Sequence, residues 1–181
     1  MLDASGSREA AALVAIQHRI DQPTVVRAAT GMSLFGEHAA GWLALGAAGA
    51  ALDPTRRREW VSSAVAVAGA HGASIVLKRV VRRRRPHDPR IAVHVGTPSR
   101  LSFPSSHATS TTAAAVAYGS ILGRRGALPL TAVIPAMALS RLVLGVHYPT
   151  DVLAGSALGA ACALAARRVI ERGRLGRWRT R

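Results

Sequence analysis

Residues 104–151, PSSHATSTTAAAVAYGSILGRRGALPLTAVIPAMALSRLVLGVHYPTD, contain two apolar runs separated by an arginine pair. The first run follows a turn at 104–107 that contains serine and histidine, and it ends near Leu122. The second extends from Ala127 to about Leu144. Apolar runs of about 14 to 20 residues can cross a membrane as helices when the helices pack tightly or the bilayer thins locally. The stretch therefore predicts two membrane-spanning helices joined by a short charged turn.

The same pattern of apolar runs between charged clusters continues through most of the chain. Three further spans are predicted at about 33–52, 60–77 and 150–166. These runs are rich in Ala, Gly and Ser, which let helix backbones approach closely inside a membrane. The 181 residues are 49% hydrophobic, yet the formal net charge is +15, and segregation of the charges at the span ends reconciles the two values.

The N-terminal segment has a different pattern from the predicted spans. Leu13, Ile16 and Ile20 recur at helical spacing with polar residues between them, which is typical of an amphipathic helix on a membrane surface. The predicted fold class is therefore all-α: an integral membrane helical bundle of about five transmembrane helices plus an N-terminal amphipathic helix. The predicted segments are an amphipathic segment at 1–30, a transmembrane domain at 31–168 and a basic C-terminal tail at 169–181.

The distribution of basic residues predicts the orientation in the membrane. Alternating spans place the arginines at 56–58, at 124–125 and in the tail on one face, which then carries 12 arginines. The other face carries eight basic residues, and the positive-inside rule assigns the more basic face to the cytoplasm. Arginine outnumbers lysine 23 to 1, a composition typical of a GC-rich bacterium. We therefore expect a multi-pass protein of the bacterial plasma membrane.

The basic clusters also raise the question of a nucleic-acid partner. No zinc-ligand spacing or helix-turn-helix pattern accompanies them, and aromatic residues make up only 4% of the chain, too few for a stacking platform. Arginines beside membrane spans more often contact anionic lipid headgroups. We expect such headgroups as partners and no nucleic acid. The small residues of the spans leave a homo-oligomer open.

Three short motifs stand at the ends of predicted spans, and all fall on the predicted outer face of the membrane. Each motif alone is weak evidence, because basic runs near membranes and Ser-Ser-His helix caps are common. Ionisable groups at a membrane are costly and usually functional, so three motifs on one face indicate a single site. In chain order they are Lys78-x6-Arg85-Pro86, Pro104-Ser105-Ser106-His107 and Ser140-Arg141-x5-His147-x3-Asp151.

These residue types match the needs of phosphoryl transfer, which requires an in-line nucleophile and positive charge around the phosphate oxygens. The cations Lys78, Arg85 and Arg141 can supply that charge, and the two arginines offer forked donors that match phosphate geometry. Ser105 and Ser106 stand where a helix is predicted to begin. Their hydroxyls and backbone N–H groups can therefore hold an anion.

The two histidines and the carboxylate divide the remaining chemistry. Asp151 can accept a hydrogen bond from one ring nitrogen of His147, which leaves the other nitrogen free to attack phosphorus. His107 can protonate the leaving oxygen and later activate water. Because the sequence contains no cluster of carboxylates, we expect neither a metal nor another cofactor.

The three motifs resemble the signatures of the type-2 phosphatidic acid phosphatase family, which are Lys-x6-Arg-Pro, Pro-Ser-Gly-His and Ser-Arg-x5-His-x3-Asp. The first and third are intact, and Ser106 replaces the glycine of the second. The resemblance implies a membrane lipid phosphate phosphatase. In it His147 is the nucleophile, His107 the general acid and base, and Asp151 the residue that orients His147. It also implies phosphate binding by Lys78, Arg85, Ser105, Ser106 and Arg141.

The compact size and the run 140–155 are similar to small actinobacterial members of this family. That similarity implies a polyprenyl phosphosugar substrate, used in cell-wall arabinan precursor synthesis, with polyprenyl diphosphate, phosphatidylglycerol phosphate and phosphatidic acid as alternatives. Glu37 and His38, near the outer end of the first span, are candidates for contact with the headgroup. Two other classes are open: a vanadate-dependent haloperoxidase, which the apolar spans disfavour, and a non-catalytic protein that binds anionic lipid.

Overall fold

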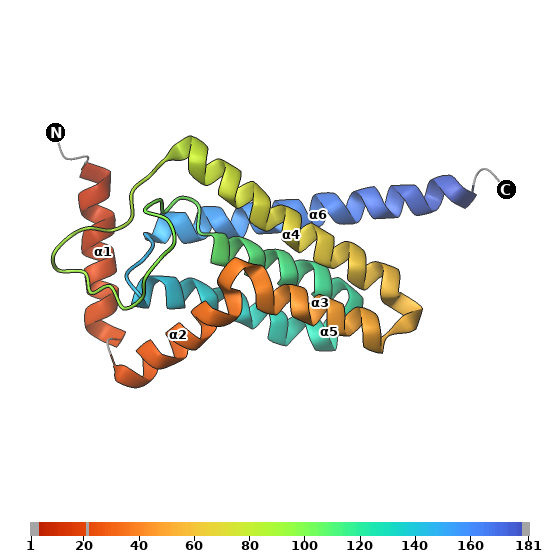
Figure 1. The fold of residues 1–181 in the computed structure, drawn as a ribbon, viewed down its shortest axis with the longest axis horizontal. Coiled ribbons are helices and arrows are strands. Elements are labelled where there is room, and N and C mark those ends of the chain that lie inside the picture. Colours follow the sequence, from red (N-terminus) through yellow and green to blue (C-terminus); the bar gives the residue numbers. More distant parts are fainter. Residues whose placement is uncertain (1–3, 21, 179–181) are drawn as a thin grey trace.

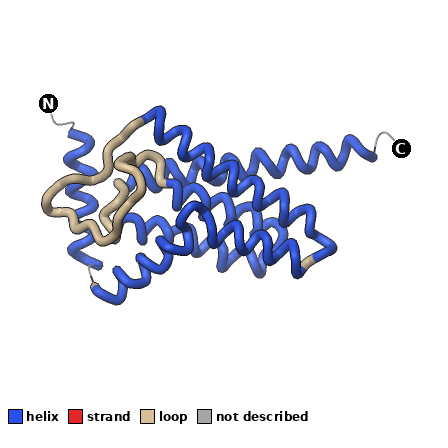
Figure 2. The backbone as a smooth tube through the Cα atoms, viewed as in Figure 1, coloured by secondary structure: helices blue, strands red, loops and turns tan. Residues whose placement is uncertain are grey.

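Six α-helices make up most of the computed structural model, which describes residues 4–20 and 22–178 (Figure 1). Short 3₁₀ turns at Glu37–Ala39 and Pro54–Arg56 join the second helix to the third and the third to the fourth. The described residues contain no β-strand, as Figure 2 shows, and the predicted all-α fold class is confirmed. The helices are α1 (Ala4–Ile20), α2 (Pro23–Gly36), α3 (Ala40–Leu52), α4 (Arg57–Val81), α5 (Ser106–Val143) and α6 (Pro149–Trp178).

Helix α5 is a hairpin of two arms. His107 near its start and Arg141 near its end both contact Ser33 of α2. A straight helix would separate those two residues by about 50 Å, at about 1.5 Å per residue. The chain reverses at Gly123, whose φ of 68° and ψ of −173° are accessible essentially only to glycine. The charged turn predicted between two spans lies at this glycine and the arginine pair that follows it.

The two arms of α5 pack with α3, α4 and α6 into one bundle (Figure 1). Trp42 of α3 donates from Nε1 to the Thr111 hydroxyl at 3.0 Å, and the Tyr118 hydroxyl donates to the Trp42 carbonyl at 2.9 Å. Both rings are buried in a cluster that also contains Trp60 and Val67 of α4. Trp42, Trp60 and Tyr118 therefore lie where three helices meet.

Three helical segments among the described residues are long and apolar enough to cross a membrane. They are Pro54–Val81, Ser106–Val143 and Pro149–Val169. Only 22% of the most apolar window in each is buried inside the protein, so most of that apolar surface faces outward. A large exposed apolar surface is stable in lipid and not in water. The chain is a membrane protein.

Helix α6 lies close against the first arm of α5 because glycines, which have no side chain, stand where the two backbones meet. A Cβ atom at Gly155 would lie 2.5 Å from the Ser105 carbonyl oxygen, and one at Gly159 would lie 2.2 Å from the Thr109 carbonyl oxygen. Backbone atoms cannot move away from such contacts at low cost, so this approach requires glycine. The packing agrees with the expectation from the small residues in the sequence.

The bundle has two ends with different architecture. The loop end carries α1 and the loop 82–105, and the turn end carries the turns at 53–56 and 122–126 (Figures 1 and 2). Arg56 donates from Nη1 to the Ile121 carbonyl at 2.6 Å, which places the two turns together. The alternating order of the four later expected spans therefore agrees with the arrangement of the bundle. The span expected at about 33–52 is instead divided between α2 and α3 by the turn at Glu37–Ala39.

Helix α1 lies across the loop end (Figure 1). Leu13 is fully buried in a cluster with Ile91 of the loop and Tyr148. The Gln17 amide donates to the Ala92 carbonyl at 2.8 Å and accepts the Ala92 backbone N–H at 3.0 Å. Part of the face that was expected to rest on the membrane surface is therefore buried against the protein, because the loop supplies apolar and hydrogen-bonding partners.

The helix boundaries differ from the segment boundaries expected at residues 30 and 168. Pro23 begins α2, a position that suits proline because the first helical residue needs no N–H donor, and α2 continues through residue 30. Helix α6 passes residue 168 without a break and ends at Trp178. The first part of the expected basic tail therefore extends a helix. Residues 1–3, 21 and 179–181 of these expected segments lie outside the described residues.

Candidate active site

A cavity of about 290 Å³ lies at the loop end of the bundle. Its walls come from α2, the turn after it, α4, both ends of α5 and the loop. The α5 hairpin explains how residues distant in sequence meet there. Two of the expected site residues, Ser105 and Asp151, lie behind the wall next to residues that form it. The other eight line the cavity: Glu37, His38, Lys78, Arg85, Ser106, His107, Arg141 and His147.

His147 and Asp151 form a buried pair at the start of α6. The Nδ1 atom of His147 lies 3.5 Å from Oδ2 of Asp151, and both side chains are buried. The same Oδ2 accepts the Tyr148 backbone N–H at 2.8 Å. Because Pro149 begins α6, Asp151 stands in the first helical turn, and the short segment before it sets the distance between the pair. At this distance the buried Nδ1 makes no hydrogen bond to a described residue, and a small approach of the two groups would let the carboxylate hold the Nδ1 proton of a neutral imidazole.

The other ring nitrogen of His147 faces a cation. Arg85 Nη1 lies 3.2 Å from His147 Nε2 and also donates to the Val146 carbonyl at 2.6 Å. With the ring proton on Nδ1 toward Asp151, the lone pair of Nε2 accepts from Arg85. Burial, together with the positive charges of Arg85 and Lys78, lowers the pKa of His147 well below its usual value. Burial also lowers the pKa of Arg85 to about 10, so Arg85 stays charged at neutral pH.

His107 and Arg141 come from opposite ends of the α5 hairpin and meet at Ser33. The Nε2 atom of His107 lies 3.0 Å from the Ser33 carbonyl oxygen, and Arg141 Nη1 donates to the Ser33 hydroxyl at 2.8 Å. The His107 ring also packs over Gly36, where an added Cβ would lie 2.7 Å from ring atom Cδ2. Helix α2 thus positions both residues. Ser33 belongs to none of the motifs, because a serine in an apolar helix carries no pattern that marks it as an anchor.

Lys78 holds the segment before α5 in addition to lining the cavity. Its Nζ donates to the carbonyl oxygens of Leu101, Ser102 and Pro104 at 3.3, 3.2 and 2.9 Å. An ammonium group has three N–H donors, so these carbonyls accept all of them. The phosphate contact expected of Lys78 therefore requires one of these hydrogen bonds to be exchanged.

The two serines at the start of α5 occupy different environments. Ser105 is the N-cap residue: its hydroxyl accepts the Ala108 N–H at 3.4 Å, and its own N–H donates to the Asp151 carbonyl at 2.9 Å. Its side chain is buried and does not line the cavity. Ser106 does line the cavity, and its hydroxyl lies 2.8 Å from that of Ser74. A side-chain contact with phosphate therefore fits Ser106 better than Ser105.

Arg83 also reaches the site, although the first motif includes it only as one of six unspecified positions. Its Nη1 donates to Asp151 Oδ1 at 3.0 Å and to the Thr150 hydroxyl at 2.7 Å, and its Nη2 contacts the Glu9 carboxylate. The guanidinium lies over the Tyr148 ring, 4.3 Å from the ring centroid. Arg83 is one of four consecutive arginines, and no spacing rule distinguishes the one that turns toward Asp151.

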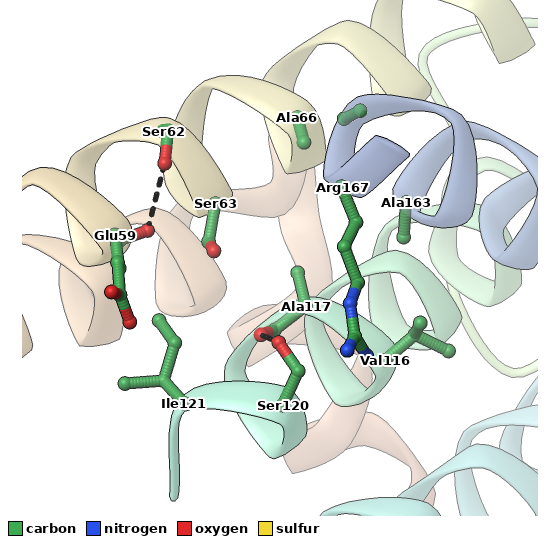
Figure 3. Close-up of a pocket in the computed structure, with 11 residues that line it drawn as sticks. Glu59, Ser62, Ser63, Ala66, Val116, Ala117, Ser120, Ile121, Ala163 and Arg167 are labelled. Atoms are coloured by element: carbon green, nitrogen blue, oxygen red, sulfur yellow. Dashed lines mark hydrogen bonds between the residues drawn. The ribbon is translucent and has the colours of Figure 1, made fainter. Parts of the chain in front are cut away.

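A second cavity of about 170 Å³ lies between α4, α5 and α6 (Figure 3). Glu59 and Arg167 line it from α4 and α6, together with Ser62, Ser63 and Ser120. None of the residues that the motifs predict is among those that line it. The cavity at the loop end is therefore the candidate active site.

Positive charge at the candidate site comes from side chains. In the part of the chain that the structure describes, no group of three or more His, Cys, Asp or Glu side chains is arranged to hold a metal ion. Lys78, Arg85 and Arg141 place three cations around the cavity. Nitrogen donors of the chain can therefore surround a phosphate there. The fold and the site together define a membrane protein built to handle phosphate.

Comparison with known proteins identifies the family. Residues 59–174 match the family model of the PAP2 superfamily, and the chain belongs to that superfamily. Decaprenylphosphoryl-5-phosphoribose phosphatase from Mycolicibacterium smegmatis is 57% identical over 149 residues, which cover 81% of this chain and 81% of that protein. The phosphatase of the same description from Mycobacterium tuberculosis is 53% identical over 154 residues, which cover 84% and 85%.

Solved structures show the same fold. The crystal structure of the first transmembrane PAP2 type phosphatidylglycerolphosphate phosphatase from Bacillus subtilis matches with a TM-score of 0.78 at 23% identity, covering 94% of this chain and 88% of that one. The resemblance found in the three motifs is confirmed. The chain is a phosphoric monoester hydrolase, a membrane-bound lipid phosphate phosphatase. The haloperoxidase and non-catalytic alternatives do not agree with these phosphatase relatives.

Proposed function

We propose that the protein removes the terminal phosphate of a polyprenyl phosphosugar, such as decaprenylphosphoryl-5-phosphoribose, by metal-independent transfer to His147. The observation that carries the proposal is the place of His147, between Asp151 and Arg85 in the wall of a cavity that His107 and Arg141 also line. The descriptions of two relatives, 57% and 53% identical, support the substrate class. The apolar outer surface of the bundle suits a polyprenyl chain that stays in the bilayer.

The first chemical step forms a bond between phosphorus and nitrogen. When Arg85 exchanges its hydrogen bond to His147 Nε2 for one to a phosphate oxygen, the freed Nε2 lone pair attacks phosphorus while the bond from phosphorus to the sugar oxygen breaks, and His107 gives a proton to that oxygen. Asp151 accepts the hydrogen bond from Nδ1 and stabilises the positive charge that develops on the ring. Arg85 and Arg141 contact the phosphate oxygens, over which the transition-state charge is spread.

The second step releases inorganic phosphate. His107, which has lost its proton, takes one from water while the water oxygen attacks phosphorus and the bond to His147 Nε2 breaks. His147 then returns to the neutral form. Because Nε2 of His107 is directed at the Ser33 carbonyl at 3.0 Å, Nδ1 is the nitrogen that exchanges protons with substrate and water in this arrangement.

The headgroup is proposed to contact Glu37 and His38, which line the cavity. His38 and Ala39 have φ angles of 49° and 61°, a left-handed conformation that costs about 1–2 kcal/mol for a residue with a side chain. Backbone strain of this kind clusters at functional sites. His71 lines the same cavity, and its buried Nδ1 has no hydrogen-bond partner among the described residues, so it is available to a sugar hydroxyl.

The protein is further proposed to lie in the bacterial plasma membrane with its loop end outside the cytoplasm. The turn end carries the arginines 56–58 and 124–125, and basic residues beside membrane spans favour the cytoplasmic face. In this orientation the cavity receives lipid phosphates from the outer leaflet.

Phosphate release in the presence of EDTA tests the proposed reaction. The purified protein in lipid nanodiscs is given decaprenylphosphoryl-5-phosphoribose, polyprenyl diphosphate, phosphatidylglycerol phosphate and phosphatidic acid in parallel. We expect the fastest release from the phosphoribosyl lipid, unaffected by EDTA. The His107→Asn variant is expected to lose on the order of 10²- to 10⁴-fold in rate, and His147→Asn nearly all activity. A faster reaction with another lipid would correct the substrate, and full dependence on a metal would overturn the mechanism.

Rapid quenching with radiolabelled substrate locates the intermediate. We expect the label on His147 and none in His147→Asn, whereas a label on another residue would contradict the assignment.

The headgroup contact has its own test: Glu37→Gln is expected to raise KM for the phosphoribosyl lipid about 10-fold and to leave KM for phosphatidic acid unchanged. Glu59→Gln, in the cavity of Figure 3, is the matched control. Equal effects of Glu37→Gln on both lipids would exclude a headgroup contact.

A further inference from the structure

We infer that Glu9 of α1 and Arg83 of the loop are positioning residues that hold Asp151 in the orientation that His147 needs. The inference rests on the proposed role of His147 as the nucleophile. Glu9 lies outside the three motifs, Arg83 is one of the six unspecified positions of the first, and neither residue lines the cavity. Both act through Asp151 and not on the phosphate.

The Asp151 carboxylate is held through both of its oxygens. Oδ2, which lies 3.5 Å from His147 Nδ1, accepts the Tyr148 N–H at 2.8 Å. Oδ1 accepts from Arg83 Nη1 at 3.0 Å. The Asp151 side chain has no exposed surface, so bulk water does not readily replace a lost partner. With both oxygens bound, rotation about the Cβ–Cγ bond is blocked and Oδ2 stays directed at the imidazole.

Arg83 is itself fixed in one geometry. Its Nη1 donates to Asp151 and to the Thr150 hydroxyl, its Nη2 contacts Glu9, and its plane lies over the Tyr148 ring. Tyr148 is also the residue whose N–H binds Oδ2, so the stacking couples the two sides of the carboxylate. A planar guanidinium can make these contacts together because its donors form a rigid fork. An ammonium group cannot.

Glu9 connects Arg83 to the first turn of α6. Its Oε2 pairs with Arg83, and its Oε1 accepts from the Thr150 hydroxyl at 2.5 Å and from the Thr150 N–H at 3.2 Å. A carboxylate at a helix N-terminus is stabilised by the free N–H groups there. Glu9 therefore fixes both the residue that binds Asp151 and the helical turn that carries Asp151. Helix α1 is thus part of the active-site structure.

The expected consequence of losing this support is a slower reaction with unchanged binding. If Oδ2 turns away, His147 loses the partner that fixes its tautomer and stabilises its positive charge. Arg85 and Arg141 still reach the phosphate from the cavity wall. The kcat value therefore falls, while the affinity for inorganic phosphate, the product, is retained.

Three adjacent arginines allow a matched test on the full chain in nanodiscs, with lipid phosphate hydrolysis and inhibition by inorganic phosphate as readouts. Arg83→Gln is expected to lower kcat on the order of 100-fold, with KM and the phosphate inhibition constant changed less than about 2-fold. Arg85→Gln, at the cavity, is expected to weaken phosphate inhibition. Arg84→Gln removes the same charge from an exposed side chain and is expected to leave both readouts unchanged.

A second set of variants separates positioning from folding. Arg83→Lys keeps the charge without the fork and is expected to remain at least 10-fold slower than the unmodified protein. Glu9→Gln is expected to lose about 10-fold, and the double variant is expected to be no worse than Arg83→Gln, because the two residues act in one chain of contacts. Rapid-quench measurement of phosphohistidine formation, with thermal unfolding of each variant, shows whether the folded protein forms the intermediate slowly. If Arg83→Gln does not fold, the Lys and Glu9 variants decide the question.

The outcomes separate this inference from the proposed function. Equal kinetics for Arg83→Gln and Arg84→Gln, in preparations where His147→Asn is inactive, overturn the positioning role and leave the proposed function intact. Weaker phosphate inhibition in Arg83→Gln means that Arg83 binds phosphate, which also contradicts positioning. Activity in His147→Asn overturns the proposed function itself.

Discussion

His147 lies between a carboxylate and a cation, and each acts on a different ring nitrogen. Asp151 faces Nδ1 at 3.5 Å, and Arg85 faces Nε2 at 3.2 Å. Burial and the nearby cations lower the pKa of the ring, so the neutral form prevails at physiological pH. Only a neutral imidazole has the lone pair needed to attack phosphorus. The burial and nearby cations that lower the pKa of His147 therefore also keep it in the neutral form that a nucleophile requires.

The lowered pKa of His147 predicts that the folded protein loses stability in acid. Unfolding returns the imidazole to its usual pKa of 6.5, so below that pH the unfolded chain binds a proton that the native ring does not yet accept. The contribution of this residue to stability is therefore complete above about pH 6.5 and declines as the pH falls below it. Replacing His147 with Gln removes the proton-binding group from both states.

Thermal unfolding of the detergent-purified protein at about pH 7.5 and about pH 5.5 measures this effect. We expect the apparent Tm of the unmodified protein to fall more on acidification than the Tm of His147→Gln. His18→Gln, a change at an exposed histidine of α1, is the control and is expected to follow the unmodified protein. The same acid-dependent loss in all three proteins would refute the link to His147.

Gly36 gives the His107 ring its place. An added Cβ would lie 2.7 Å from His107 Cδ2 and 3.0 Å from Met137 Cε, so Gly36→Ala is expected to displace the ring. A displaced proton donor predicts a kcat lower by about 10- to 100-fold. Gly31→Ala, in the same helix but with nothing within 4 Å of the new Cβ, is expected to keep kcat and to stabilise the protein by about 0.5–1 kcal/mol. Steady-state kinetics and thermal unfolding distinguish the two variants, and equal kcat values would show that the contact is unimportant.

The sequence motifs predict the three cations, the two histidines and the serine of the proposed chemistry that line the cavity, because motifs placed at span ends already imply which residues share a membrane face. They do not predict Ser33 or Arg83. Ser33 acts through its carbonyl and hydroxyl on two α5 residues, and that contact depends on how α2 packs. Arg83 is one of four consecutive arginines, and the path of the loop directs its side chain toward Asp151. The sequence records neither of these tertiary contacts.

The α5 hairpin brings the second and third motifs together, and Gly123 makes the hairpin possible. Its φ of 68° and ψ of −173° cost a residue with a side chain about 1–3 kcal/mol. Gly123→Ala is therefore expected to lower the apparent Tm by about 2 to 10 °C, although a Cβ there meets nothing within 4 Å. Gly69→Ala in α4 also meets nothing and has ordinary helical backbone, so it is expected to cause no loss. Equal Tm values for the two variants would contradict the conformational argument.

At the level of whole helices, hydropathy predicts where a helix crosses the membrane, and it does not predict how far that helix extends beyond the membrane. Residues beyond 168 are too polar for a membrane span, yet α6 extends to Trp178, because arginine is a good helix former and the segment contains no proline, even though Gly173 and Gly176 each disfavour a helix. The burial of Leu13 and Gln17 of α1 shows the same limit. An amphipathic pattern predicts that one face is covered, and it does not say whether lipid or protein covers it.

Across the whole molecule, the apolar bundle separates a loop end with the cavity from a turn end with two arginine-containing turns. The hydrogen bond from Arg56 to the Ile121 carbonyl joins those turns, so their charge is concentrated at one end. Arg167 of α6 lines the cavity of Figure 3 together with Glu59 and Ile121, and Arg168 is the next residue, so both arginines add to the charge near that end. By the positive-inside rule, this end is proposed to lie in the cytoplasm.

Single cysteines at the two ends test this orientation. The native Cys162 is first replaced with Ala, and the same Arg→Cys change is then made at Arg100 in the loop or at Arg125 in the α5 turn, both exposed positions. A membrane-impermeant maleimide is expected to label Arg100→Cys in intact cells and Arg125→Cys only after the cells are permeabilised. The reverse pattern would place the cavity in the cytoplasm. The arginine excess at the turn end is modest against the eight basic residues of the loop end, so the count of charges favours one orientation without fixing it. The labelling pattern decides the orientation and therefore the leaflet from which the substrate enters the cavity.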